Sequence, residues 1–232
     1  MILFYINKFL NKINILIFIL FIPYIFFTFS NSIYVPGHDE ANQIEAALYF
    51  SNNCIFSFSN VIPNDFSSRN FKFQNEWPIG FPILLLLFLK LNIKQFLALK
   101  IIKMLLFFST MFIWNKIISI SIKDNIKKNI FVIILFLILI LISQSMTDFI
   151  VTFLFSIIFY LLQKYHNHYD NYFYHFKISF LIGLAFIFKY SSVFILPSTI
   201  LYILCFNRVT PYKKLKYIAI HFFIFLLFFI FL

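Results

Sequence analysis

Apolar residues in this chain form repeated runs separated by short polar segments. A helix needs about twenty residues, at roughly 1.5 Å each, to cross the hydrocarbon core of a bilayer. The pattern therefore predicts a series of membrane-crossing helices, some of them tilted or short. The expected spans are 13–29, 95–118, 130–143, 149–163, 178–188, 193–206 and 217–232.

The sequence between 34 and 77 is polar and forms the one sizeable loop of the expected topology. Within it, residues 39–51 carry apolar positions with few breakers, which predicts a short helix at the membrane surface. Residues 52–64 are rich in Asn, Ser and Pro, which is typical of irregular chain. The apolar segment 83–89 is short for a span, so we expect it to be re-entrant or interfacial.

Most of the 19 basic residues cluster in short segments between the apolar runs. Cytoplasmic loops of membrane proteins carry an excess of Lys and Arg, so these clusters favour a cytoplasmic N-terminus and an outer loop at 34–77. The lysines between 90 and 103 favour the opposite threading, but they are fewer than the basic residues that the preferred threading places in the cytoplasm. We expect an all-α fold, a polytopic transmembrane bundle with about seven spans, forming a single domain over 1–232.

Composition excludes a water-soluble fold, because 62% of residues are hydrophobic and only 12% are charged. The net charge of +11 would indicate nucleic acid in a soluble protein. Here the basic residues are orientation signals, so we expect membrane lipids and no nucleic acid as partners. The expected location is a membrane that the chain crosses several times.

Four charged residues call for an explanation, because ionised groups at membrane depth are expensive. Asp39 and Glu40 follow the first expected span, Asp148 lies between two apolar runs, and Lys189 separates two others. The expected threading puts all four on the outer face. Carboxylates in such a place can act as general bases or metal ligands, and an ammonium group can bind a phosphate.

A purely structural role can also explain each of these residues. Either Asp39 or Asp148 can cap the helix that follows it, since Asp is a preferred capping residue. Lys189 can pair with Asp148, or it can mark the outer end of a helix with its ammonium group in water. The residues alone leave these alternatives open.

Histidines offer a weaker indication of a metal site. His166, His168 and His175 fall in the expected loop 163–177 among several tyrosines, where a polar loop with an aromatic belt is the commoner explanation. His38 is better placed, because it precedes Asp39.

Five motifs occur in an order that resembles the GT-C glycosyltransferases. The similarity is greatest to the bacterial branch related to protein O-mannosyltransferases and to the aminoarabinose transferases that modify lipid A. After the first span come Gly37-His38-Asp39-Glu40, then Trp77-Pro78-Ile79-Gly80-Phe81-Pro82, Thr147-Asp148, Gly183 to Tyr190, and Pro197.

The resemblance implies transfer of a sugar from a polyprenyl-phosphate donor to a lipid, glycan or protein acceptor at the outer face of the bacterial cell (cytoplasmic) membrane. Asp39, Glu40 and Asp148 would be the catalytic acids, and Asp39 would also be the ligand of a divalent metal ion, the one cofactor considered. Lys189, Tyr190, Trp77, His38 and Glu76 would bind substrate.

The chain departs from this family in two respects. Relatives often carry Lys-Pro or His-Pro-Pro where this sequence has Glu76-Trp77-Pro78, so one phosphate or metal contact is expected to be missing. Relatives also continue for further spans, so we expect a truncated member. The alternatives are a transporter or channel with a path through Asp148 and Lys189, and a non-catalytic membrane protein.

Overall fold

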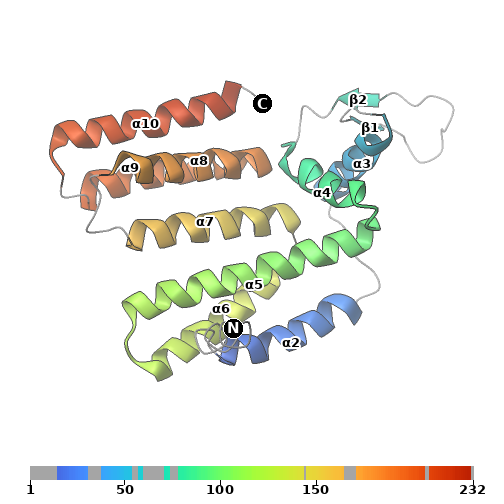
Figure 1. The fold of residues 1–232 in the computed structure, drawn as a ribbon, viewed down its shortest axis with the longest axis horizontal. Helices are drawn as coiled ribbons and strands as arrows, with labels where there is room; N and C mark the ends of the chain where they lie inside the picture. Colours follow the sequence, from blue (N-terminus) through green and yellow to red (C-terminus); the bar gives the residue numbers. More distant parts are fainter. Residues whose placement is uncertain are drawn as a thin grey trace, which may run out of the picture. The chain divides into compact units, whose positions relative to one another are not determined.

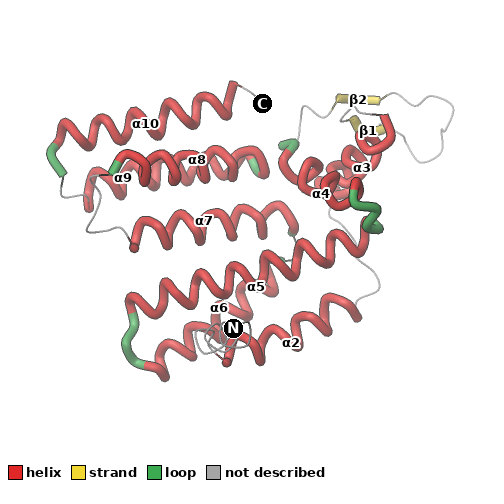
Figure 2. The backbone as a smooth tube through the Cα atoms, viewed as in Figure 1, coloured by secondary structure: helices red, strands yellow, loops and turns green. Residues whose placement is uncertain are grey.

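The computed structural model describes residues 15–30, 38–53, 57–59, 71–73, 78–143, 145–164, 171–206 and 209–230. Nearly all of these residues are helical, which confirms the predicted all-helical class (Figures 1 and 2). The helices are α2 (Ile15–Ser30), α3 (His38–Asn53), α4 (Gly80–Lys90), α5 (Gln95–Ser121), α6 (Asn125–Ile142), α7 (Met146–Lys164), α8 (Tyr172–Phe188), the 3₁₀ helix η1 (Tyr190–Phe194), α9 (Ile195–Phe206) and α10 (Pro211–Ile230).

Three helices in the described ranges are long and apolar enough to cross a membrane, namely α5, α6 and α7. Shorter apolar helices accompany them, among them α4, α8 and the segment 190–205. This character indicates a membrane protein, as the apolar runs predicted. The expected segment at 83–89 is indeed short, since α4 has 11 residues.

Local sequence signals explain where several helices begin. The carboxylate of Asp124 accepts hydrogen bonds from the backbone N–H groups of Ile126 (2.8 Å) and Lys127 (3.4 Å), which caps α6. Asn171 caps α8 in the same way, through the N–H of Phe173 at 2.9 Å. Proline at the first position of α10 is also favourable, because its missing N–H would have no helical partner there.

A small β-ribbon departs from the expected pattern. Strand β1 (Ser57–Ser59) pairs antiparallel with β2 (Phe71–Phe73), where the sequence predicted irregular chain over 52–64. Strands of three residues are too short to show a readable alternation, so sequence periodicity gave no signal for them.

The chain divides into two compact units. The first comprises residues 1–34 and 100–164 and centres on Phe107, which is 1% exposed. The Phe107 ring stacks on Tyr24 from α2 (centroids 3.7 Å apart) and meets the edges or faces of Phe136 from α6 and Phe149 from α7. Aromatic packing therefore joins the four helices that the structure describes in this unit.

The second unit comprises residues 35–99 and 165–232. In it, α8, α9 and α10 lie side by side (Figure 1). Tyr172 near the start of α8 contacts Tyr217, and Phe186 near its end contacts Phe229. Contacts that advance together along both helices show that α8 and α10 run parallel, with α9 returning between them in sequence.

Gly183 allows α8 and α10 to approach closely. A Cβ atom at this position would clash with the ring of Phe228, so any larger residue requires that ring to move. The two compact units are groups of packed helices within one chain. That residues 1–232 form a single transmembrane domain stays a prediction.

Candidate functional site

Two of the sequence motifs meet in the second unit. Gly80, the first residue of α4, lies against the end of α8, and a Cβ on it would be 2.8 Å from the carbonyl oxygen of Ile187. Ile187 is two residues before Lys189. The motif that contains Gly80 and the Gly183–Tyr190 motif are therefore neighbours, although about a hundred residues separate them in sequence. Glu76 and Trp77 lie outside the described residues.

Helix α3 carries the first acidic pair and packs on α4. Its buried positions include Gln43, Ile44 and Ala47. At the far end of this helix pair, the Lys90 ammonium donates to the carbonyl oxygen of Ser51 at 3.4 Å, so the last turns of α3 and α4 meet. The packing fixes α3 beside the helix that contacts α8.

The first turn of α3 contains His38, Asp39 and Glu40. Because the helix already begins at His38, Asp39 is in its second position and not at the capping position before it. The side chains of these residues lie outside the described part of the chain, so their roles, including metal binding by Asp39, stay predictions.

Lys189 lies at a break between two helices. Its backbone is extended (φ −157°, ψ 120°), its N–H donates to the carbonyl of Ala185 at 3.0 Å, and its carbonyl accepts from Ser192 N–H at 3.0 Å. The side chain is half-buried. The ring of Tyr190 packs on Phe186 with centroids 5.3 Å apart. Both candidate substrate-binding residues thus lie at the end of α8 that contacts Gly80.

Asp148 is the third residue of α7 and is half-buried. The capping bond at this helix start is supplied by Ser145, whose hydroxyl accepts from Asp148 N–H at 3.4 Å. This arrangement assigns the capping role to Ser145. Asp148 belongs to the first unit and Lys189 to the second, so their predicted meeting stays a prediction.

No group of three or more His, Cys, Asp or Glu side chains able to hold a metal occurs among the described residues. His166 and His168 lie outside them. The expected loop position of His175 was wrong, because α8 begins at Tyr172 and includes His175. The side chain of His175 is fully buried.

A buried polar network centres on that histidine. His175 and His221 are each 0% exposed, and Nδ1 of His175 lies 3.4 Å from Nε2 of His221. Ser179 completes the network, with its hydroxyl 2.6 Å from Nδ1 of His221. The His175 ring also stacks on Tyr217, with centroids 3.8 Å apart.

One arrangement of protons satisfies every contact in this network. The Ser179 hydroxyl donates to the carbonyl oxygen of His175 at 2.7 Å, so its oxygen accepts the proton of His221 Nδ1. A neutral His221 then has an acceptor at Nε2, and His175 Nδ1 donates to it. The three groups join α8 to α10 by directed bonds within apolar surroundings.

Sequence reasoning missed His221 and Ser179. The usable signal was helical spacing, because His175 and Ser179 are four residues apart in α8, as are Tyr217 and His221 in α10. Residues at that spacing share one helix face.

No family model, curated protein or solved structure matches this chain. The resemblance to GT-C glycosyltransferases therefore depends on the motifs and their order.

Proposed function

We propose that this protein is a membrane glycosyltransferase of the GT-C type, which transfers a sugar from a polyprenyl-phosphate donor to a lipid, glycan or protein acceptor. The contact between Gly80 and Ile187 carries the proposal. It brings together two motifs that the resemblance singled out independently. A donor site formed by α4 and the Lys189 end of α8 accounts for this proximity.

Each polar residue has a distinct part in the proposed reaction. An acceptor oxygen bonds to the anomeric carbon of the sugar while the bond from that carbon to the phosphate oxygen breaks. Asp39 or Asp148 takes the acceptor proton, and the electron pair leaves on polyprenyl phosphate. The Lys189 ammonium stabilises the departing phosphate. Glu40 would act beside Asp39 as a further catalytic acid. The substrate site would be shaped by His38, Glu76, Trp77 and Tyr190.

A divalent metal ion at Asp39 is the one cofactor that this proposal includes. It would neutralise charge on the phosphate when bound. Lys189 supplies a positive charge without it, and the reaction as described needs no other group.

The proposed topology has about seven spans in the cell membrane, with the reaction on the outer face. The parallel direction of α8 and α10 supports this threading, because helices on either side of one returning span must point the same way. Lys177 and Lys216, which precede the apolar parts of these two helices, then share the cytoplasmic side.

The test uses membranes that contain the full chain and a radiolabelled sugar linked to polyprenyl phosphate. Asp39→Asn, Asp148→Asn and Lys189→Gln should each reduce transfer, by roughly a hundredfold or more for an acid that acts as the base. Insertion is verified by protease protection of each variant.

Asp124→Asn is the matched control, because Asn caps a helix as well as Asp does and the position is exposed at the start of α6. Lys127→Gln is the corresponding control for Lys189. Full transfer by inserted Asp39→Asn and Asp148→Asn proteins would overturn the proposal.

A further inference from the structure

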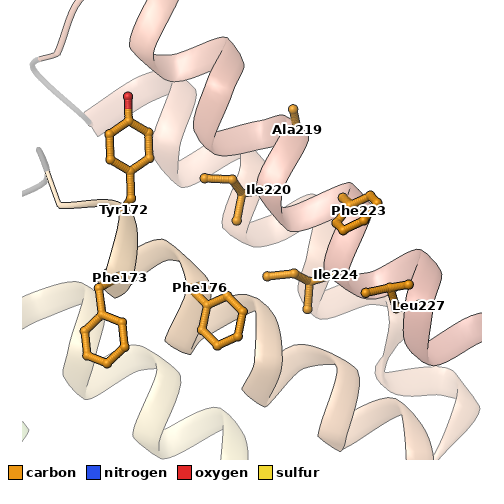
Figure 3. Close-up of a pocket in the computed structure, with 8 residues that line it drawn as sticks. All are labelled: Tyr172, Phe173, Phe176, Ala219, Ile220, Phe223, Ile224 and Leu227. Atoms are coloured by element: carbon orange, nitrogen blue, oxygen red, sulfur yellow. The ribbon is translucent and has the colours of Figure 1, made fainter.

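An apolar groove runs between α8 and α10 on an exposed side of this helix pair, in the second unit. It has a volume of about 670 Å³ and is lined from α8 by Tyr172, Phe173 and Phe176, and from α10 by Ala219, Phe223 and Leu227 among others. Figure 3 shows Tyr172 at one end of the groove and Leu227 at the other.

The groove is open along its length. Phe173 is 63% exposed and Phe223 is 64% exposed, so their rings face the surroundings of the helix pair. The lining offers almost no polar atom apart from the Tyr172 hydroxyl at the upper end (Figure 3). Such a surface suits a flexible hydrocarbon chain, which needs contact area and no hydrogen-bond partner.

Two lysines bring positive charge to the Tyr172 end. Lys216 lies three residues before Ala219 and seven before Phe223, on the same face of α10. Its ammonium group interacts with the side chains of Tyr172 and Tyr212, and lies 4.5 Å from the Tyr212 ring centroid.

Lys177 supplies the second charge, from α8. Its ammonium lies 4.4 Å from the ring centroid of Phe173, a groove residue one turn away. Lys214 on α10 is engaged elsewhere, because it donates to the carbonyl of Leu204 at 2.6 Å. The groove therefore has an apolar length and a cationic end.

We propose that this groove binds one glycerophospholipid with an anionic head group, with an acyl chain against Phe176, Phe223 and Leu227 and the phosphate beside Lys216 and Lys177. The charge asymmetry decides the occupant. An anionic head group carries a net negative charge that two cations at one end attract, whereas a neutral helix or a zwitterionic lipid carries no net charge. The lipid belongs to the leaflet that contains the starts of α8 and α10. The site is separate from the proposed sugar-transfer site at the other end of α8.

The test measures lipid binding to the purified full chain in mild detergent by native mass spectrometry. Phosphatidylglycerol and phosphatidylcholine with identical acyl chains are the two probes. One lysine near an anionic lipid surface strengthens binding roughly fivefold, so phosphatidylglycerol should bind roughly thirtyfold more tightly.

The variant Lys177→Gln/Lys216→Gln should abolish this preference and leave phosphatidylcholine binding unchanged. The control Lys123→Gln/Lys127→Gln removes two exposed charges near the start of α6 and should keep the preference. Equal binding of both lipids by the unaltered protein, or an equal loss in both double variants, would overturn the proposal.

A second pair of variants tests the groove itself. Ala219→Trp places a large ring in the groove and should reduce tightly bound lipid at least about tenfold. Leu226→Trp adds a similar ring to an exposed position of α10 outside the lining and should not. If Ala219→Trp instead converts a dimer to a monomer without changing bound lipid, the groove is an interface between two copies and the lipid proposal fails.

Discussion

The imidazole Nδ1 of His175 lies within hydrogen-bond distance of Nε2 of His221, at 3.4 Å, deep between α8 and α10. The bond is directional, and Ser179 holds the acceptor ring in place from its other nitrogen. In apolar surroundings neither group can exchange its partner for water. The pair therefore fixes the rotation of each helix about its own axis more strictly than Phe and Ile contacts do.

Replacing one histidine should destabilise the protein more than replacing both. His221→Phe leaves the His175 N–H without an acceptor, which costs about 1–3 kcal/mol. In His175→Phe/His221→Phe no unpaired donor remains, so the double variant should recover part of that loss. Thermal unfolding in detergent measures the cycle. Additive losses would mean that the two rings are not coupled.

Gly183→Ala should weaken the packing of α8 on α10. The new methyl group would clash with the Phe228 ring, and overpacking of this kind costs about 1–3 kcal/mol. Phe228→Leu should rescue Gly183→Ala, because it removes the ring that the methyl group meets. Unfolding temperatures of the single and double variants decide the matter, and a failure of rescue would indicate another cause.

Variants at Ser145 and Asp148 should separate effects on stability from effects on sugar transfer. Ser145→Ala removes the capping bond of α7 and should destabilise the protein by about 1 kcal/mol while transfer per folded molecule is retained. Asp148→Asn should do the reverse, with normal unfolding and little transfer. If Asp148→Asn lowers only stability, Asp148 has a structural role and the proposed reaction loses one of its acids.

The threading predicts opposite accessibility for the two ends of α9. In a Cys54→Ser/Cys205→Ser background, Ser191→Cys should react with a membrane-impermeant maleimide in intact cells. Thr210→Cys should react only after permeabilisation. Both positions are exposed in the structure, so burial does not interfere. Labelling of both from one side would show that α9 does not cross the membrane.

Helix positions followed closely from the sequence. The run predicted at 95–118 became α5 (Gln95–Ser121), and the polar break at Lys189 separates α8 from η1 as expected. Apolar length and polar interruptions determine such boundaries, because each span must satisfy its own backbone within the bilayer. The number of crossings is not decided by these boundaries and stays a prediction.

Contacts between helices did not follow from the sequence. The His175–His221 bond joins residues 46 positions apart, and it depends on how each helix is rotated. Helix α8 is apolar around most of its circumference, so no stripe marked the face toward α10. The proximity of Gly80 to Ile187 was hidden for the same reason, although both motifs were recognised separately.

The meeting of α4 with α8 adds a stabilising contact to a helix of only 11 residues, besides its packing on α3. The end of α8 bears partial negative charge on its last carbonyl groups, and the start of α4 bears partial positive charge on its first N–H groups. Where Gly80 lies against the carbonyl group of Ile187, these opposite partial charges attract each other. A helix too short to span the bilayer can therefore begin inside a protein interior, beside the residue proposed to hold a phosphate.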